Sequence, residues 1–518
     1  MVAIFIVVQL LLVACCVQAD LPIHVLVHDI AGKWRIFQTK PVGGLDVMCG
    51  SSMPNSLEKN LQLGNYLNYL QDHYTLDRTI DFELSLDVTN YDDTTHKRNR
   101  ELWNALAVKD RDGNVVGRWT IVNDQGFEVI VHNSTRYFFY MHYSKKGDNV
   151  YETDPNHAEI GWAYTSGEDL NSESRRMCAY AAKLDASPPS KATLVSLNTN
   201  VKDMFKLVDR SISRGDSSHG AIKSEHVSPK QGAYPCNCTS VNRRNFENEL
   251  PTSFVWKTRA TIPVVNQESC GSCHAIASRY VLQARFLIAL ERMKNRTPEL
   301  DAVLEELSHY TFEPNDVKDC SIYNQGCSGG YPYLMGKHMR EFGLVTTKDS
   351  SNQCSILSAS RRYFAKEYGY VGGCHQCTAC RGEELIMREL YANGPVVSAL
   401  DATILPTEYD GHIIRANESE ANSGVCDIPQ HPILTGWEYT SHAVAIVGWD
   451  ETRVDGRVVK YWICRNSWGE NWGDYGYFKI ERGNNAYGIE SEAVFIDPDF
   501  SKFAQEPASP VLHDIHYH

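Results

Sequence analysis

The sequence lacks a surplus of positive charge. Its 518 residues include 50 Lys and Arg against 64 Asp and Glu, so the formal net charge is −14 at pH 7. Binding to nucleic-acid phosphates needs a basic face, and this composition therefore argues against a nucleic-acid partner. Because 42% of the residues are hydrophobic and 22% are charged, the chain can bury a core and is not disordered throughout. Its length suggests about three folding units.

Beyond its first 19 residues the sequence also lacks any apolar run of the ~18 residues that cross a bilayer. Residues 1–19 are almost wholly apolar and end in Val17-Gln18-Ala19, with small residues where a signal peptidase requires them. They contain no Lys or Arg, so an uncleaved anchor is the alternative. We expect a cleaved signal peptide and a mature chain that begins at Asp20, has no membrane span and enters the secretory pathway.

An oxidising compartment changes what the cysteines do. Cleavage after residue 19 removes two of the 16 cysteines, and the remaining 14 are expected to include structural disulfides. The same compartment permits N-glycosylation, and three Asn-x-Ser/Thr triplets can accept a glycan. These triplets begin at Asn133, Asn237 and Asn417.

The sequence lacks an internal repeat with a period of roughly 20 to 50 residues, and it divides by composition instead. From residue 20 to residue 183 apolar and polar positions alternate with period two, as in strands with one buried face. Such short strands, separated by turn residues, predict an antiparallel barrel or sandwich. The strands are expected at residues 34–38, 82–89, 115–122, 127–132 and 136–143.

Two further units follow the first one. Residues 184–249 are rich in Ser, Pro and Lys, with one weakly amphipathic stretch at 201–208, and they fit either a linker or a pro-segment that proteolysis removes. Residues 250–518 contain more Trp, Gly and Cys, and are expected to form an α+β domain. In this last unit we expect a long helix at 273–293 and strands at 443–447, 461–464 and 476–480.

Three residues of the last unit suit nucleophilic catalysis. Cys273 opens the expected long helix, where unpaired N–H groups and the helix dipole favour a thiolate, although position alone also fits half of a disulfide. His442 offers an imidazole that can take the thiol proton and return it to a leaving amine. Asn466, 24 residues later, can fix the orientation and tautomer of that ring. Trp468 can shield the hydrogen bond between them from water.

This order of Cys, His and Asn resembles the papain-like cysteine peptidases over residues 250–496. The resemblance implies that Cys273 is the nucleophile, His442 the general base and then acid, and Asn466 the residue that orients the ring. It also implies an oxyanion hole built from the Gln267 amide and the Cys273 backbone N–H. Substrate-binding positions follow from the same resemblance, and they are Gly329, Gly330 and Trp468.

The sequence departs from that family in three ways. His274 stands where an aromatic ring is usual and could change the pKa of the thiolate. Ser441 stands where Asn or Asp commonly precedes the histidine. His442 lies 169 residues after Cys273, beyond the usual ~130 to 150, which insertions between them can explain.

The first unit extends the resemblance to the dipeptidyl peptidase I, or cathepsin C, group of the same family. The shared segments include Asn123-Asp124-Gln125-Gly126-Phe127-Glu128 and Leu250-Pro251-Thr252-Ser253. The resemblance implies that residues 20–183 form a β-barrel exclusion domain, which blocks the cleft beyond the second substrate residue. Asp20 would then present its carboxylate to the free α-ammonium of the substrate, which is cationic below pH ~8. The alternative for Asp20 is a solvated terminal charge.

The expected activity is therefore that of a lumenal cysteine-type dipeptidyl peptidase, which acts through an acyl-enzyme thioester on substrates with a free amino terminus. The nearest rival is an endopeptidase of the same fold whose β domain inhibits or targets it. A second rival is a catalytically silent binding protein on this scaffold. A thiol oxidoreductase or zinc module at residues 374–380 would lack the expected thioredoxin-like pattern.

The resemblance also implies a chloride ion at the base of the S2 pocket, and neither an organic cofactor nor a metal. Tyr331, Tyr333 and Tyr370 occupy the matching positions, and phenolic O–H groups suit an anion. A homotetramer is the assembly that the resemblance suggests. A lysosome, a lysosome-like vacuole or secretion is the expected destination. Removal of residues before Leu250 and a nick between Arg415 and Thr440 are the expected processing events.

Disulfide pairs follow from the resemblance in three cases: Cys49 with Cys178, Cys270 with Cys327, and Cys320 with Cys354. Seven other cysteines stay unassigned once Cys273 is set aside. In an oxidising lumen we favour local disulfides over a zinc site for Cys374-His375-Gln376-Cys377-Thr378-Ala379-Cys380. The unassigned cysteines are Cys236, Cys238, Cys374, Cys377, Cys380, Cys426 and Cys464.

Overall fold

The computed structural model of the chain describes residues 23, 25–55, 65–91, 100, 103–147, 150–166, 175–185, 195–196, 250–258, 260–349, 354, 361–374, 382–406, 409–415 and 440–503. Other residues carry some of the expectations above, which therefore lie outside this description. These are the signal peptide, Asp20, Asn237, Asn417, the helix at 201–208, Cys236, Cys238, Cys377, Cys380, Cys426 and the expected cleavage sites.

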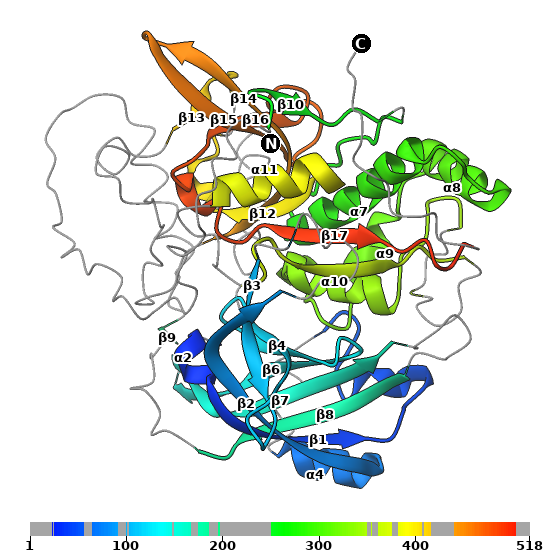
Figure 1. The fold of residues 1–518 in the computed structure, drawn as a ribbon, viewed down its shortest axis with the longest axis vertical. Coiled ribbons are helices and arrows are strands. Elements are labelled where there is room, and N and C mark those ends of the chain that lie inside the picture. The colour runs from blue at the N-terminus through cyan, green and yellow to red at the C-terminus, as the bar shows by residue number, and fades with distance from the viewer. Residues whose placement is uncertain are drawn as a thin grey trace, which may run out of the picture.

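The N-terminal unit is a closed antiparallel barrel (Figure 1). Its strand order is β6-β5-β4-β3-β2-β1-β8-β7-β9, and pairing of β6 with β7 closes the barrel. The fold class predicted from the period of two is thus confirmed. The elements are α2 (Val27–Ile30), β1 (Gly32–Thr39), η2 (Gly44–Met48), α4 (Tyr66–His73), β2 (Leu76–Asn90), β3 (Asn104–Lys109), β4 (Val115–Val122), β5 (Gly126–Val131), β6 (Thr135–Gly147), β7 (Val150–Thr165), β8 (Arg175–Lys183) and β9 (Val195–Ser196).

One strand of the barrel departs from the pattern. The alternation over residues 82–89 predicts that every second residue is buried, and Phe82 and Leu84 are. Leu86 and Val88, however, are 43% and 48% exposed. Between Leu84 and Val88 the pairing of β2 with β3 changes register. Such a bulge turns the following side chains away from the interior.

The second unit contains an eight-stranded mixed sheet in the order β11-β17-β12-β14-β15-β16-β13, with β10 paired to β14. Helices lie beside this sheet (Figure 1), which confirms the α+β expectation. The elements are β10 (Phe254–Val255), α7 (Cys273–Arg292), α8 (Pro298–His309), α9 (Pro314–Asp319), η5 (Gly326–Ser328), α10 (Pro332–Glu341), β11 (Ala365–Tyr370), α11 (Gly382–Asn393), β12 (Val396–Leu400), η6 (Ala402–Ile404), β13 (Ile413–Ile414), β14 (His442–Val454), β15 (Arg457–Arg465), β16 (Tyr477–Glu481), η7 (Ala486–Gly488) and β17 (Val494–Pro498).

Helix α7 is the central element of this unit. The sequence predicts an amphipathic helix, but the side chains of α7 are buried on nearly all sides, including Arg279 and Arg285. Four helices and three strands surround it: α8, α9, α10, α11, β12, β14 and β17. A helix enclosed in this way holds its first residue in a fixed place, and that residue is Cys273.

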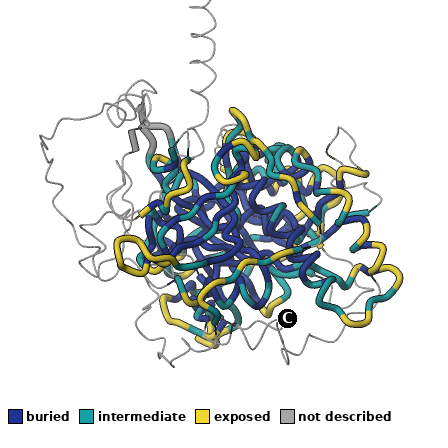
Figure 2. Tube along the Cα trace, turned by 90° about the horizontal axis from the view of Figure 1, so that it is seen from above, coloured by how far each residue is buried: buried dark blue, intermediate teal, exposed yellow. Residues whose placement is uncertain are grey.

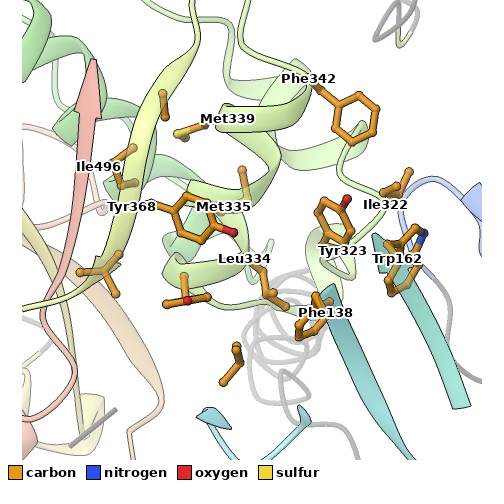
Figure 3. Packing of buried hydrophobic residues seen from close by; sticks show 14 of the residues in the cluster. Phe138, Trp162, Ile322, Tyr323, Leu334, Met335, Met339, Phe342, Tyr368 and Ile496 are labelled. Carbon is orange, nitrogen blue, oxygen red and sulfur yellow. The ribbon is translucent and has the colours of Figure 1, made fainter. Parts of the chain in front are cut away.

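The two units share a buried interface. Figure 3 shows Phe138 of β6 and Trp162 of β7 directed at Tyr323 of the second unit. The ring centroids of these two residues lie 6.1 and 5.2 Å from that of Tyr323, both with edge-to-face geometry. The Tyr140 hydroxyl donates to the Tyr323 backbone oxygen over 2.5 Å. Buried segments accordingly occupy the centre of the trace, and exposed ones lie mainly at its periphery (Figure 2).

Candidate active site

The candidate nucleophile lies at the amino end of the central helix. Cys273 is the first residue of α7, follows the N-cap Ser272, and is half-buried with a free thiol. N–H groups in the first helical turn have no carbonyl partner within the helix, so the Cys273 N–H can bind a ligand. The positive end of the helix dipole also favours a negative charge on the sulfur. One residue thus provides both a thiolate and an oxyanion donor.

Two paired strands bring His442 and Asn466 together. His442 opens β14, Asn466 follows directly after β15, and these strands pair antiparallel. The His442 Nε2 atom lies 2.7 Å from Asn466 Oδ1. Because an amide oxygen can only accept, Nε2 is the donor, and this fixes the ring tautomer. The other ring nitrogen, Nδ1, is left for the Cys273 thiol.

An indole covers this hydrogen bond. The centroid of the half-buried Trp468 ring lies 5.2 Å from that of His442. The backbone of Trp468 forms a bridge with Asn266, just before the oxyanion segment. His442 and Asn466 are only 6% and 3% exposed, and a hydrogen bond shielded from water is stronger than an exposed one. Trp468 therefore has the shielding position that the sequence predicts.

The two reacting groups shift each other's pKa. Burial alone would raise the pKa of the Cys273 thiol, but the charge of His442 and hydrogen bonding from the His274 and His442 rings hold it well below its usual value. Burial would lower the pKa of His442, but the Cys273 thiolate and the Asn466 amide raise it. These opposite shifts favour a thiolate–imidazolium pair over a neutral thiol and imidazole. Such a pair is a prepared nucleophile with a proton donor beside it.

The Gln267 amide is held in place by its neighbours. Its backbone N–H donates to the Ser467 carbonyl over 2.8 Å, and its Oε1 accepts a short hydrogen bond from the Ser467 hydroxyl. Its Nε2 donates to the Cys270 carbonyl over 2.9 Å, which leaves a second Nε2 hydrogen for an oxyanion. Sequence reasoning gave Ser467 no role. The only feature of the sequence that could have indicated a role for Ser467 is its position directly after Asn466.

A disulfide holds the glycine segment, residues 327–330, beside the nucleophile. Cys270 is bonded to Cys327, and the Gly271 N–H donates to the Cys327 carbonyl over 2.9 Å. Gly330 has φ of 156°, and a Cβ atom there would lie 2.3 Å from Asn324 Oδ1. No side chain fits at this position, and the bare backbone suits pairing with an extended peptide.

The two departures near the catalytic residues have different environments. The Ser441 hydroxyl accepts a hydrogen bond of 3.1 Å from the Ala402 N–H, so it ties down a neighbouring loop. His274, the second residue of α7, is 1% exposed. Neither of its ring nitrogens has a hydrogen-bond partner of regular geometry among the residues described.

The three tyrosines of the expected chloride site gather where the two units meet. The Tyr333 and Tyr370 rings stack with centroids 4.7 Å apart, and Tyr331 is the N-cap of α10. The Tyr333 hydroxyl donates to the Glu128 carboxylate over 2.7 Å. The Tyr370 hydroxyl hydrogen-bonds with Asn123 Oδ1 over 3.2 Å. Both partners belong to the barrel.

These partners decide which groups suit an anion. The Tyr333 phenol is engaged by a carboxylate, which would repel an anion. The Tyr333 backbone N–H lies in the first turn of α10 without a helical acceptor, and the Tyr370 hydroxyl would exchange its bond to Asn123 Oδ1 for one to the ion. A small cavity beside them is also lined by Arg118. The backbone N–H and the Tyr370 hydroxyl therefore fit a small anion better than the Tyr333 phenol does.

The described cysteines include the three disulfides expected from the resemblance: Cys49–Cys178, Cys270–Cys327 and Cys320–Cys354. Cys374 is disulfide-bonded as well, which leaves it unsuited to bind zinc. Cys464, whose pairing the sequence left unassigned, is a free buried thiol in β15, and burial raises its pKa far above the usual value. Its place in a central strand keeps it away from other cysteines within the described part of the chain.

Three further observations concern the surface and possible ligands. Asn133, an expected glycan acceptor, lies exposed in the turn between β5 and β6. The described residues include no group of three or more His, Cys, Asp or Glu side chains arranged to hold a metal ion. Over the same part of the chain, no helix has both the length and the apolar character needed to cross a membrane.

Comparison with known proteins adds independent information. A family model described as the papain family cysteine protease matches residues 250–496, and a model described as the cathepsin C exclusion domain matches residues 20–183. Dipeptidyl aminopeptidase 1 of Plasmodium falciparum is 28% identical over 96% of this chain and 97% of its own length. Cathepsin C of Schistosoma mansoni is 28% identical over 74% and 84%. Cathepsin O of Mus musculus is 31% identical over 48% and 69%.

Proposed function

The chain belongs to the papain family of cysteine proteases, and on this basis we propose that it is a dipeptidyl peptidase, which removes dipeptides from the free amino termini of peptides and proteins. The peptidase chemistry rests on the Cys273, His442 and Asn466 arrangement. The restriction to dipeptides rests on the barrel. Two relatives that match over most of this chain carry the names dipeptidyl aminopeptidase 1 and cathepsin C, which supports the same conclusion.

The reaction follows from the geometry in two stages. The Cys273 thiolate attacks the carbonyl carbon of the scissile peptide bond, and the oxyanion receives hydrogen bonds from the Cys273 N–H and Gln267 Nε2. The His442 imidazolium gives its proton to the leaving amine, so the carbon–nitrogen bond breaks and a thioester remains. Water then gives a proton to His442 and attacks the thioester, which releases the dipeptide and restores the thiolate.

The observation that carries the exopeptidase assignment is the contact between the barrel and the substrate-binding glycine segment. Tyr323 and Tyr333 flank Gly329 and Gly330 in the chain, and barrel residues bind both tyrosines. The Gln325 amide also donates to the Tyr140 hydroxyl over 3.3 Å. We infer that a domain anchored on both sides of this segment would block a longer chain beyond the second substrate residue. It therefore acts as a stop.

In this proposal Asp20 selects substrates that have a free amino terminus, since its carboxylate would pair with the substrate ammonium. The test compares a peptide with a free amino terminus and the same peptide N-acetylated, with product masses followed over time. We expect dipeptide release from the free peptide only, and Cys273→Ser as a control without turnover. Equal cleavage of both peptides would refute the Asp20 role. Internal fragments from either peptide would favour the rival endopeptidase.

We also propose a chloride ion near the S2 pocket, held by the Tyr333 backbone N–H and the Tyr370 hydroxyl. When bound, the ion supplies a fixed negative charge. Tyr370→Phe removes one donor, so we expect a weaker dependence of KM on chloride concentration than in the unmodified enzyme. The measurement is a chloride titration against acetate at constant ionic strength. A dependence that is identical in both proteins would contradict the proposal.

For the cell, we propose entry into the secretory pathway, glycosylation at Asn133, Asn237 and Asn417, and delivery to a lysosome, a lysosome-like vacuole or the exterior. A homotetramer is the proposed assembly. N-terminal sequencing of the mature protein should give Asp20, and its mass should fall after glycan removal. Light scattering should report four times the mass of one processed chain. A start at Met1 or an unchanged mass would contradict these proposals.

A further inference from the structure

His274 is a polar side chain in a position that has no need of one for packing. It follows the nucleophile directly on α7, is 1% exposed, and neither Nδ1 nor Nε2 has a regular hydrogen-bond partner among the described residues. A buried imidazole without partners lowers stability, because its nitrogens lose their hydrogen bonds to water. An apolar ring of similar size would avoid that cost.

An acceptor stands beside this ring once Cys273 is ionised. His274 follows Cys273 directly in the first turn of α7, and hydrogen bonding and charge from its ring both lower the pKa of the Cys273 thiol. Every protonation state of an imidazole keeps at least one N–H donor. A thiolate accepts hydrogen bonds strongly, whereas a neutral thiol accepts them weakly. The missing partner of His274 is therefore present only in the reactive form of the enzyme.

We propose that His274 is a positioning residue that donates a hydrogen bond to the Cys273 thiolate and shares the stabilisation of this anion with His442. Burial keeps His274 away from substrate, so it acts through the sulfur alone. The proposal rests on the peptidase function proposed above and adds a residue to its nucleophile. In support of it, His274 is among the groups that lower the pKa of Cys273.

Other charged groups around α7 lie further from the sulfur. From β14, the group that faces Cys273 is His442. Arg285 of α7 pairs with Glu389 of α11 and Asp497 of β17, about 18 Å along the helix axis from Cys273. The other titratable groups on elements packed against α7 include Arg279 on α7 itself, Glu306 of α8, Asp316 of α9, and Lys337, His338 and Glu341 of α10.

A second donor has two opposite consequences for reactivity. It extends the thiolate to lower pH, because a hydrogen bond to the charged form favours that form. It also makes each thiolate less nucleophilic, since nucleophilicity falls with pKa at a Brønsted slope of about 0.4 to 0.5. His274 should therefore trade peak reactivity for reactivity in an acidic lumen. Loss of His274 should therefore raise the pH at which the thiolate forms and also make that thiolate more nucleophilic. Simple structural damage does not produce this combination.

The test measures the rate at which iodoacetamide alkylates Cys273 between pH 3 and pH 9 in the full-length processed protein. For His274→Phe we expect the acidic limb to move up by about one pH unit and the high-pH plateau to rise about two- to threefold. His274→Gln keeps an N–H donor and should move the limb by less than half as much. His338→Phe is the matched control, since His338 is also a buried histidine without a regular partner, and it should leave both features unchanged.

Two outcomes would overturn the proposal. One is an acidic limb that stays within about 0.2 pH units of the unmodified protein in both His274 variants. The other is a lower plateau with an unshifted limb, which indicates damage to the site. Alkylation needs no peptide substrate, so these outcomes are separate from failure of the dipeptidyl peptidase assignment. Circular dichroism of each variant confirms that it is folded before the rates are compared.

Discussion

At the scale of single residues, Asn466 controls both the orientation and the charge of His442. Its amide oxygen accepts from Nε2 over 2.7 Å, and this bond helps to raise the pKa of the ring. Asn466→Ala should therefore lower that pKa and move the basic limb of kcat/KM to lower pH by about one unit. We also expect kcat/KM to fall at least about tenfold, because the ring can then adopt the wrong tautomer.

A pH-rate profile with a dipeptidyl substrate checks this prediction. Asn485→Ala is not a suitable control, because its side chain holds a buried loop through Ser491. Asn114→Ala is suitable, since Asn114 is exposed in the barrel and bonds only locally to Asp110. A basic limb that stays in place in Asn466→Ala would show that the amide does not support the imidazolium.

His338 on α10 should make stability depend on pH. Burial, together with the charges of Arg362 and Arg176, lowers its pKa to about 3, against about 6.5 in the unfolded chain. Its folded form binds fewer protons than the unfolded form between these values. Its contribution to stability is thus fully present above pH 6.5 and is lost as the pH falls towards 3, at about 1.4 kcal/mol per unit.

His338→Phe removes that titration. Between pH 7.5 and pH 4.5 the unmodified protein should lose about 2 to 3 kcal/mol more stability than this variant. Urea unfolding at the two pH values measures the difference. The exposed His309, replaced by Gln, serves as the control and should follow the unmodified protein. If His338→Phe and the unmodified protein lose the same amount of stability between the two pH values, His338 does not titrate in this way.

Single residues could be singled out from sequence where the chemistry demands one residue type. A thiol, an imidazole and an amide seldom occur in this order by chance, and the structure brings Cys273, His442 and Asn466 together. Ser467 was missed, because a hydroxyl that orients Gln267 carries no distinctive spacing. The state of Cys464, a free thiol, was left open, since no local pattern shows whether a strand cysteine has a partner.

At the scale of elements, the glycine segment is where shape matters most. The Asn324 side chain lies against Gly330 and also accepts from the Tyr331 N–H over 2.8 Å, at the start of α10. Gly330→Ala would push this side chain away and disturb both the substrate backbone site and α10. We expect kcat/KM to fall at least about tenfold and stability to drop by about 1 to 3 kcal/mol.

Steady-state kinetics and thermal unfolding test this prediction. Gly43→Ala is the matched control, because no atom lies within 4 Å of a Cβ there and φ is −135°. It should behave as the unmodified protein. Full activity in Gly330→Ala would mean that the segment can move aside, and that its bare backbone is not required for binding.

Prediction of elements from sequence depended on periodicity. Helix α7 and the strands β1, β4, β5 and β6 were found within about five residues, because helical spacing and alternation arise from burial against one neighbour. Only part of β2 was predicted, and β3, β7, β8 and β9 were missed. The exposed half of β2 was not foreseen, since a bulge is set by the partner strand. The burial of α7 on nearly all sides was not foreseen either, because it depends on how elements distant in the sequence are arranged around the helix.

At the scale of the complete chain, one arginine joins the two units. Arg100 comes from the N-terminal unit and is fully buried between Glu389 of α11 and Asp497 of β17, with bonds of 2.8 and 2.9 Å. Arg285 of α7 bonds to the same two carboxylates. The Arg100 guanidinium also lies 3.7 Å from the centre of the Phe495 ring. Removing it leaves two buried carboxylates with one remaining arginine.

Arg100→Ala should therefore cost about 3 to 5 kcal/mol of stability, as when one partner of a buried ion pair is removed. Urea unfolding measures this loss, and activity on dipeptidyl substrates shows whether the barrel still lies in place. Arg78→Ala, which removes an exposed pair with Asp77, is the control and should cost about 1 kcal/mol or less. If Arg100→Ala loses no more stability than Arg78→Ala, the network does not hold the units together.

The succession of a β-rich unit and an α+β unit was predictable, since composition changes along the chain, whereas the predicted middle unit lies largely outside the described residues. The packing of one unit on the other was not, because Arg100, Phe138 and Trp162 gain meaning only from partners more than 150 residues away. No periodicity within one segment encodes such a contact. Long-range packing of this kind must be observed.

The sharpest test of dipeptidyl peptidase activity is the pattern of products from one long peptide with a free amino terminus, followed by mass spectrometry over time. We expect a ladder in which the peptide shortens by two residues at each step, with no internal fragments, and no products from Cys273→Ser. Internal fragments in the first minutes, or an undiminished ladder from Cys273→Ser, would contradict this assignment.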